Sequence, residues 1–406
     1  MNTQLKTALL FVVILMVFVG IAVVAYHEMA FYFGRAPQGV SYVEAFSPIL
    51  EPESFVHQGN DHEPYIEASP EYEYESEYTY NGYDEPPEIY EPEPYIPEPP
   101  SNIVTITLSA AGDTTLGGDR RWAGYHAFMR EFENSGRDHS HFFRNIAHVF
   151  YESCLSIVNL EGTLTYADEH MDKEFVFRGP PHFAQILSTS YVDAVTISNN
   201  HTIDYFQRGY DDTVNALRAE GIVYFGNEFK TIMEVNGIQV GMFGYRIWQD
   251  TAENRNRIRA AIANLQERGA QLVIAYFHWG VERENFPEQY QINIGRYTIR
   301  NGADLVLGAH PHVIQGIEEY MGRFIVYSLA NFSFGGNANP PDQDSFIFQQ
   351  TFSFYDGVLL PYNVKNVIPV FVSSVRYRND FRPTVAEGAD ADRIMARMER
   401  YSEWLR

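Results

Sequence analysis

Two histidines stand two residues apart immediately after a short apolar run in the second half of the chain. The run covers residues 305–307, and His310-Pro311-His312 follows it. A short apolar run predicts a buried strand, and the functional side chains of open α/β sheets gather beyond the carboxyl ends of strands. Because a proline restricts the residue before it, we expect His310 to be extended and both imidazoles to project to one side. Such a pair can bind one metal ion or two adjacent ones, although two histidines on a surface loop look the same in a sequence.

Four further apolar runs also end in side chains that can bind a metal ion. These runs cover residues 103–110, 155–158, 193–197 and 271–277. In chain order, the side chains that follow them are Asp113, Glu161, Asn200 with His201, and His278. One such residue after a strand is commonplace, but five endings of this kind are difficult to attribute to chance. Carboxylates, an amide and imidazoles suit a borderline or hard divalent cation, so the sequence predicts a metal site.

The segments between these runs predict the elements that position the site. Apolar residues at helical spacing predict helices over 207–220, 253–268 and 288–301. Asn236-Gly237 between two alternating segments predicts a hairpin over 231–245. Strands that alternate with helices are typical of an α/β fold with parallel strands. Residues 346–354 and 367–377 predict closing antiparallel strands, and residues 390–406 a terminal helix.

The amino-terminal third has a different character. Residues 8–26 form an uncharged apolar run after Lys6, long enough at about 1.5 Å per residue to cross a bilayer core of about 30 Å. We favour an uncleaved single-pass anchor, with Lys6 in the cytoplasm and the bulk of the chain outside the cell membrane. A cleavable signal peptide is the alternative, because the small residues near Ala25 resemble a cleavage site.

Residues 27–100 are rich in Glu, Tyr and Pro, with 17 acidic side chains and one basic residue, Arg35. Repulsion between carboxylates and the loss of donors at prolines predict a disordered tether. Binding of a cationic partner or of divalent ions is the alternative role. The remainder of the chain is moderately acidic, which excludes nucleic acid as a partner. Cys154 is the only cysteine, so we expect no disulfide.

Six ordered blocks resemble the bacterial capsule-synthesis protein CapA family, which is linked to poly-γ-glutamate production. The blocks are 112–117, 158–162, 198–204, 277–282, 308–315 and 327–332. That family resembles a branch of the calcineurin-like metallophosphoesterase superfamily. The resemblance implies a four-layer α/β/β/α sandwich with two divalent metal ions at the strand ends, without distinguishing Mn, Zn, Fe and Mg.

The resemblance also implies roles for single residues. The implied metal ligands are Asp113, Glu161, Asn200, His278, His310 and His312, with His201 as the acid that protonates a leaving group. The implied supporting residues are Asn199, Asp204, Glu282, Gln315 and Asn331. Two positions depart from the pattern: Thr115 stands where phosphoesterases have a histidine, which weakens the first metal position, and Ala330 stands where the family has glycine.

These observations predict four segments: an anchor at 1–26, a linker at 27–100, a CapA-like domain at 101–380 and a helical tail at 381–406. The predicted function is metal-dependent hydrolysis in the synthesis or export of a capsule polymer, with the substrate bond left open. The expected partners are an anionic polymer such as poly-γ-glutamate or a phosphoester, membrane polymer-synthase subunits, and the lipid bilayer through residues 8–26. A non-catalytic assembly subunit that handles the polymer is the competing hypothesis, and a plain phosphatase is the third.

Overall fold

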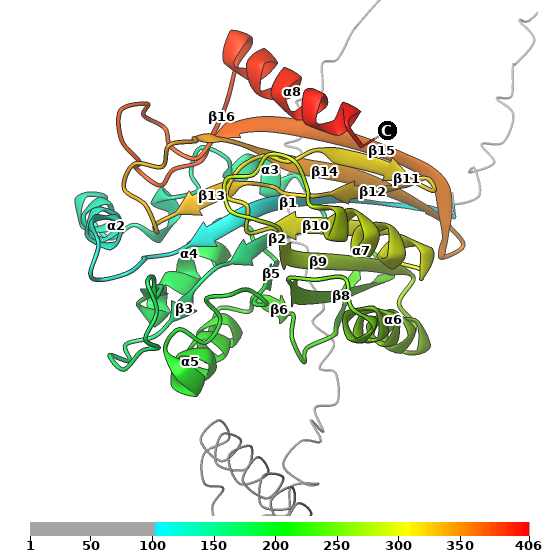
Figure 1. The fold of residues 1–406 in the computed structure, drawn as a ribbon, viewed down its shortest axis with the longest axis horizontal. Coiled ribbons are helices and arrows are strands. Elements are labelled where there is room, and N and C mark those ends of the chain that lie inside the picture. The colour runs from blue at the N-terminus through cyan, green and yellow to red at the C-terminus, as the bar shows by residue number, and fades with distance from the viewer. Residues whose placement is uncertain (1–101, 406) are drawn as a thin grey trace, which may run out of the picture. The chain divides into compact units, whose positions relative to one another are not determined.

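Two β-sheets face each other in the computed structural model, which describes residues 102–405 (Figure 1). The first sheet has the strand order β16-β15-β14-β1-β2-β5-β6, with β13 paired to β1. Its parallel strands are β1 (Ile103–Thr115), β2 (Leu155–Leu160), β5 (Ala194–Thr196), β6 (Val223–Phe225) and β13 (Asn331–Phe334). Its antiparallel strands are β14 (Asp344–Tyr355), β15 (Val358–Phe371) and β16 (Thr384–Val385).

The second sheet has the strand order β11-β12-β10-β9-β8-β7. Four parallel strands form its centre: β8 (Ile238–Ile247), β9 (Leu272–Trp279), β10 (Leu305–Ala309) and β12 (Arg323–Val326). The antiparallel edge strands are β7 (Thr231–Val235) and β11 (Ile317–Tyr320). Two short strands, β3 (Thr163–Leu164) and β4 (Arg178–Gly179), pair separately. The predicted mixed α/β fold is confirmed.

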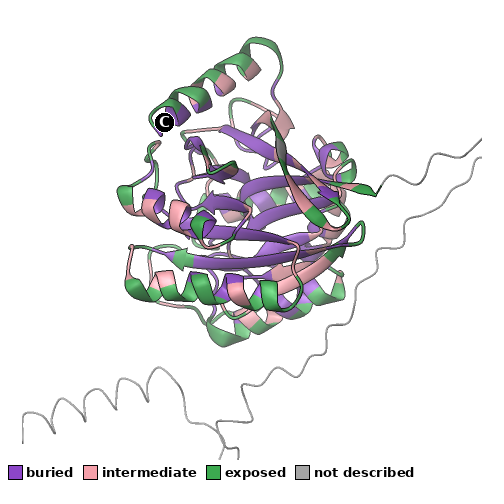
Figure 2. Cartoon of the chain, turned by 90° about the vertical axis from the view of Figure 1, so that its right-hand side faces the viewer, coloured by how far each residue is buried: buried purple, intermediate pink, exposed green. Residues whose placement is uncertain are grey.

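Three apolar cores divide the domain into layers. Along β9, Leu272, Ile274 and Tyr276 enter the core between the two sheets, while the intervening residues enter the core on the outer side of the second sheet. This alternation follows from the two-residue period of a strand and explains why β9 is buried throughout. Figure 2 shows buried strands inside and helices with exposed outer faces.

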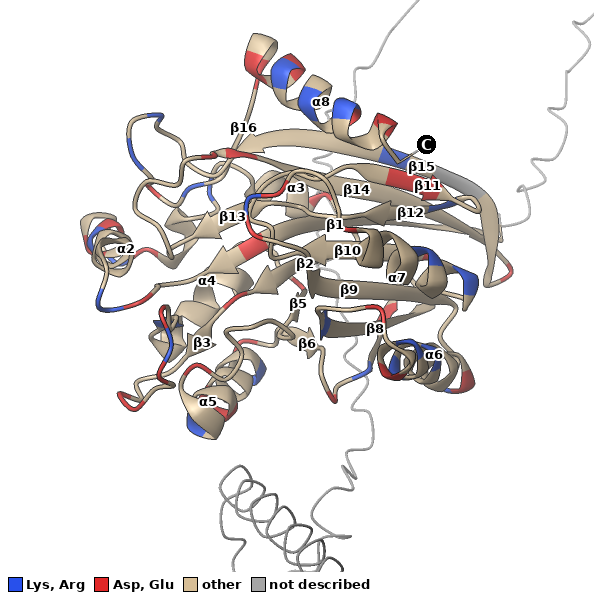
Figure 3. Cartoon of the chain, viewed as in Figure 1, with Lys and Arg blue, Asp and Glu red and all other residues tan. Residues whose placement is uncertain are grey.

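The helices cover both outer faces of the paired sheets. The first sheet is covered by α2 (Ala123–Asn134), α3 (Ala147–Tyr151), α4 (Ala184–Ser188) and α5 (Phe206–Ala219), and the second by α6 (Ala252–Glu267) and α7 (Gln289–Arg300). Short 3₁₀ turns lie at η1 (His139–His141) and η2 (Pro181–Phe183). The charged residues of the helices lie on the side away from the sheets, whose strands carry few charges (Figure 3). This pattern is typical of amphipathic helices on a buried sheet.

The predicted hairpin is confirmed between β7 and β8. Asn236 and Gly237 both have positive φ angles, of 50° and 78°. A two-residue turn of this kind requires positive φ at both positions, which Asn and Gly adopt at low cost. The hairpin places β8 beside β9, and β9 carries His278.

The C-terminal helix α8 (Gly388–Glu403) packs into the core between the sheets through Ile394, Met398 and Tyr401. Arg393 and Arg397 bind Asp344 of β14, with N–O distances of 2.5 and 2.8 Å. The segment predicted as a helical tail therefore contributes apolar contacts and ion pairs to the same domain. Among residues 102–405, no helix is both long and apolar enough to cross a bilayer, and the predicted anchor at 8–26 and linker at 27–100 lie outside the described residues.

Candidate metal centre

The carboxyl ends of parallel strands bring the predicted ligands together. Asp113 lies near the end of β1, Glu161 directly follows β2, and Asn200 and His201 follow β5. His278 is the last residue but one of β9, and His310 and His312 follow β10. β1 and β2 belong to the first sheet, whereas β9 and β10 belong to the second. The site therefore lies where the strand ends of the two sheets meet.

Asp113 and His312 form one side of the site. The Oδ2 atom of Asp113 lies 3.0 Å from Nδ1 of His312 and accepts a hydrogen bond of 3.1 Å from the backbone N–H of His310. Its Oδ1 atom accepts a hydrogen bond of 2.7 Å from the amide of Asn159. Gly112 allows this arrangement, because a Cβ atom there would lie 1.9 Å from the carbonyl oxygen of Ala330.

Glu161 lies at the centre of the site. Its Oε1 atom is 3.7 Å from Nε2 of His278 and 3.9 Å from Nε2 of His201, and its Oε2 atom is 3.9 Å from Nδ1 of His312. Neither oxygen has a hydrogen-bond partner among the described residues, although the side chain is buried. Buried carboxylates are normally paired or bound to a cation.

The second side of the site holds His278 and Asn200. Nε2 of His278 lies 2.6 Å from the side-chain oxygen of Asn200, and Nδ1 lies 3.3 Å from the amide of Asn159. His310 lies beside this pair, with its ring centroid 4.6 Å from that of His278. Nδ1 of His310 also lacks a partner among the described residues.

Three overlapping groups of side chains have the geometry to hold a cation. They are Glu161 with His278 and His310, Asp113 with Glu161 and His312, and Glu282 with His310 and His312; in each group the ligand atoms lie within 4.8 Å of one another. Glu161 belongs to the first two groups. The partnerless oxygens of Glu161 and the mixed oxygen and nitrogen donors fit divalent metal ions.

The charges within the site are poorly balanced by the protein alone. Burial raises the pKa of Glu161 well above its usual value, and the charge of Asp113 raises it further. Burial alone would lower the pKa of His312, but Glu161 and Asp113 raise it to about 10. Burial and the neighbouring histidines hold the pKa of His278 well below its usual value. A proton on His312 therefore supplies positive charge that a divalent cation would otherwise supply.

His201 belongs to a separate group of interacting side chains at the edge of the site. Its Nδ1 atom lies 2.6 Å from Oδ2 of Asp204, and Nζ of Lys173 lies 2.6 Å from Oδ1 of the same carboxylate. The His201 ring stacks on Phe177 with a centroid distance of 4.0 Å. Burial lowers the pKa of His201 although Asp204 opposes that change. Asp204 contacts Nδ1, so Nε2 is the ring nitrogen that faces Glu161, at 3.9 Å from Oε1.

The predicted supporting residues differ in how closely they contact the predicted metal ligands and His201. Asn199 accepts a hydrogen bond of 3.0 Å from the His201 backbone N–H, and Asn331 donates one of 3.3 Å to the His312 carbonyl. Glu282 is exposed and approaches the metal-ligand candidates only through the third group above. Gln315 bonds to Gln291 and to a backbone carbonyl, so its hydrogen bonds hold the loop after β9 and touch none of the predicted ligands.

The prediction of an extended His310 is wrong. Its φ angle is 97°, and that of His312 is 59°, so both residues occupy the sparsely populated positive-φ region. The sequence argument treated Pro311 as the only constraint, whereas the hydrogen bond from His310 N–H to Asp113 also fixes this backbone. Ala330 has a φ angle of 61°, a conformation that costs glycine less than alanine.

Four residues at the site were not predicted from the sequence. Asn159 bridges Asp113, His278 and Asn199; Lys173 binds Asp204; Phe177 stacks on His201; and the Trp248 ring lies 4.7 Å from that of His310. Asn159 lies near the end of β2, two residues before Glu161, so the position after an apolar run was a usable signal. Lys173 and Phe177 lie in the long loop after β3, where no periodic pattern marks them.

The family model and two curated relatives that match this chain are described as capsule or PGA biosynthesis proteins. A family model described as bacterial capsule synthesis protein PGA_cap matches residues 107–336. The PGA biosynthesis protein CapA of Bacillus subtilis (strain 168) is 26% identical over 213 residues, which cover 47% of this chain and 56% of that protein. The capsule biosynthesis protein CapA of Bacillus anthracis is 25% identical over 264 residues, which cover 56% and 60%.

The matched region spans 56–60% of the length of these curated relatives. Among solved structures, a hypothetical protein from Thermus thermophilus matches 65% of this chain and 99% of its own, with 15% sequence identity and a TM-score of 0.39. A score of this size is too low to infer a shared fold.

Proposed function

Because the chain belongs to the bacterial capsule synthesis protein family described as PGA_cap, we propose that it acts in the synthesis or export of a poly-γ-glutamate capsule as a metal-dependent hydrolase. The names of the two Bacillus relatives support the role in capsule formation. The observation that carries the chemistry is the buried Glu161 carboxylate, which has no hydrogen-bond partner among the described residues and faces three imidazoles. Stability alone does not account for a group of this kind.

Two divalent ions fit the donors at the site. Asp113, Glu161 and His312 would hold one position, and Glu161, His278 and His310 the other. Asn200, whose side-chain oxygen lies 2.6 Å from Nε2 of His278, would assist at the second position. Ions bound there would supply a Lewis acid that lowers the pKa of a bound water molecule and polarises an oxygen of the substrate. The bound cations would also reverse the local charge, which an acidic chain needs in order to accept a polyanion.

The protein's own contribution to the reaction is the group around His201. Asp204 accepts from Nδ1, so the proton that the ring gives or takes is at Nε2, on the side that faces Glu161. Lys173 forms an ion pair with Asp204 beside it. The stacked Phe177 ring covers one face of the imidazole and excludes water there. His201 thus has the position of a general acid for a leaving group.

The amino-terminal segment is the basis for the proposed location of the protein in the cell. Residues 8–26 would anchor the chain in the cell membrane as a single-pass helix, and the linker at 27–100 would carry the domain on the extracytoplasmic side. Membrane polymer-synthase subunits and the emerging polymer would then be its partners. These assignments rest on the sequence, since both segments lie outside the described residues.

The test combines metal content with hydrolysis by the full-length chain. We expect about two divalent ions per chain after metal loading. We also expect cleavage of either a phosphoester or a γ-linked oligoglutamate that falls by about 10²–10⁴-fold in His201→Asn. His126→Asn, outside the site, is the control and should behave like the wild type. A chain that binds no divalent metal under any loading condition would refute the proposal.

A non-catalytic assembly subunit is the second candidate, favoured by one observation. Thr115 stands two residues after Asp113, where phosphoesterases would carry a histidine, and its buried hydroxyl has no hydrogen-bond partner among residues 102–405. One metal position therefore has fewer strong ligands. If His201→Asn leaves polymer output intact in cells while Glu161→Ala abolishes it, the metal acts as a docking charge and this candidate replaces hydrolysis.

A further inference from the structure

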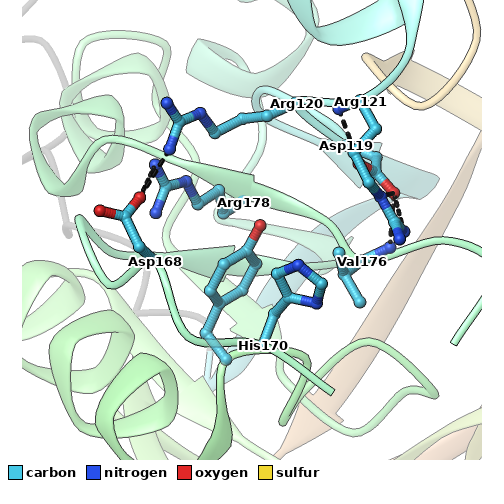
Figure 4. Close-up of a pocket in the computed structure, with 8 residues that line it drawn as sticks. Asp119, Arg120, Arg121, Asp168, His170, Val176 and Arg178 are labelled. Carbon is cyan, nitrogen blue, oxygen red and sulfur yellow. Dashed lines mark hydrogen bonds and ion pairs between the residues drawn. The ribbon is translucent and has the colours of Figure 1, made fainter. Parts of the chain in front are cut away.

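A second polar pocket lies beside His201 and outside the candidate metal centre. It has a volume of about 280 Å³ and is lined by Arg120, Arg121, Arg178, Asp119, Asp168 and Tyr205, among others. None of the candidate metal ligands lines it. Figure 4 shows Arg120 and Arg178 directed at Asp168 on one side, with Arg121 and Asp119 paired on the other.

The pocket carries surplus positive charge on an acidic protein. Arg121 binds Asp119 through two nitrogens, at 2.9 and 2.6 Å. Arg120 and Arg178 both donate to the same oxygen of Asp168, at 2.6 and 3.1 Å. Three guanidinium groups thus face two carboxylates, which leaves one positive charge for a ligand. A single carboxylate matches that charge, whereas a phosphoryl dianion would exceed it.

Arg178 provides the donor that an anionic ligand would need. Its side chain is 9% exposed, and its Nη1 atom has no hydrogen-bond partner among the described residues. The guanidinium carbon also lies over the Tyr205 ring, 5.2 Å from its centroid. A buried guanidinium N–H that lacks an acceptor costs free energy, and anionic oxygens such as those of a carboxylate are acceptors that such groups bind strongly.

A short extended segment separates this pocket from His201. Val176 and Arg178 line the pocket, while the ring of Phe177 between them stacks on His201. The backbone N–H of Val176 donates to Asp119, and that of Phe177 donates to Asp204. Successive residues of an extended segment face opposite sides, so the pocket and His201 share one segment. Phe177 thus separates the pocket from His201 by the thickness of one segment.

We propose that the arginine pocket binds one carboxylate of an extended polycarboxylate chain while another part of that chain lies at the metal centre. This inference rests on the proposed function and refines it, because it assigns the substrate to polycarboxylates and not to phosphoesters. Arg178 supplies the hydrogen bonds, and Arg120 keeps Asp168 from neutralising Arg178. The pocket then selects chains that carry a negative charge beyond the scissile bond.

The test measures binding to the full-length chain by calorimetry after metal has been chelated, so that bound metal does not contribute. The probes are a γ-linked oligoglutamate and inorganic phosphate at matched ionic strength. The variants are Arg178→Lys, which keeps the charge but removes the forked donors, and Arg120→Gln at a half-exposed position. Arg137→Gln is the control, because the exposed Arg137 side chain forms its ion pair with Glu133, away from the pocket.

We expect both pocket variants to weaken oligoglutamate binding by about tenfold or more, as loss of a charged hydrogen bond would. The control should match the wild type, and phosphate should bind more weakly than oligoglutamate. Equal affinity in all four proteins, no binding, or phosphate binding as tight as that of oligoglutamate would each overturn the proposal. Failure of the proposed hydrolase would appear separately, as absence of bound divalent metal in the loaded protein.

Discussion

Substitution of Glu161 should have opposite effects on stability with and without metal. Glu161→Gln keeps the shape of the side chain and removes its charge. In the metal-free chain, the carboxylate is buried, has no hydrogen-bond partner among the described residues and is repelled by Asp113. In the metal-loaded chain, the same carboxylate is the ligand shared by two of the candidate groups. A residue retained for packing alone would not show this reversal.

The expected magnitudes follow from the two environments. Removal of an unpaired buried charge should raise the free energy of unfolding of the metal-free chain by about 1 kcal/mol, since protonation already relieves part of the cost. Metal at about 100 times its dissociation constant should stabilise the wild type by about 2.7 kcal/mol. The variant should gain almost none of this. The order of stability of the two proteins therefore inverts on addition of metal.

Thermal unfolding of full-length proteins, followed by circular dichroism, measures both effects. At about 2 °C per kcal/mol for a domain of this size, metal should raise the wild-type Tm by about 5 °C. The control is Glu133→Gln, which removes an exposed carboxylate from a surface pair with Arg137 and should leave the metal response unchanged. An equal rise of Tm in the wild type and in Glu161→Gln would refute the role of Glu161 as a metal ligand.

Two further predictions concern the domain that carries the site. Burial would raise the pKa of Asp344, but hydrogen bonds from Arg393 and Arg397 lower this pKa below 3.8. The ionised Asp344 therefore stabilises the fold above its unfolded pKa, and this stabilisation is lost as the pH falls through the folded pKa. Asp344→Asn should therefore cost about 1–2 kcal/mol near pH 7, and in urea unfolding this cost should shrink as the pH falls below 3.8 and through the folded pKa; a cost that does not change with pH would contradict the linkage. Gly112→Ala should destabilise the chain by about 3 kcal/mol or more and abolish metal binding, because its Cβ would lie 1.9 Å from the backbone oxygen of Ala330; near-wild-type stability and metal content would show that β1 and β13 can separate.

The sequence predicts the architecture well because the strands are buried on both faces. Such strands are short apolar runs, and the position where each run stops is visible without any structure. Five strands end close to Asp113, Glu161, Asn200, His278 and His310. Because these strands are parallel within their sheets, residues that are far apart in the sequence lie together at the carboxyl ends of the strands. The hairpin at Asn236-Gly237 was predictable for a similar reason, since its turn chemistry is local.

The backbone of the histidine loop was not predictable by the same reasoning. Proline restricts its neighbour by local sterics, but the hydrogen bond from His310 to Asp113 joins residues 197 positions apart. A long-range contact of this kind can hold a residue in a conformation that costs about 1–3 kcal/mol. The positive φ angles of His310 and His312 are therefore a product of the assembled site.

Only some of the contacts around His201 could be predicted from the sequence. His201 and Asp204 lie three positions apart, so their contact was within reach of the sequence. Lys173 and Phe177 reach the same group from the loop after β3, whose polar composition predicts only a connection. The same loop carries Asp168 into the arginine pocket, and Arg121 donates to its backbone carbonyls at Lys173 and Glu174. One loop without periodicity thus contributes side chains both to the group around His201 and to the arginine pocket.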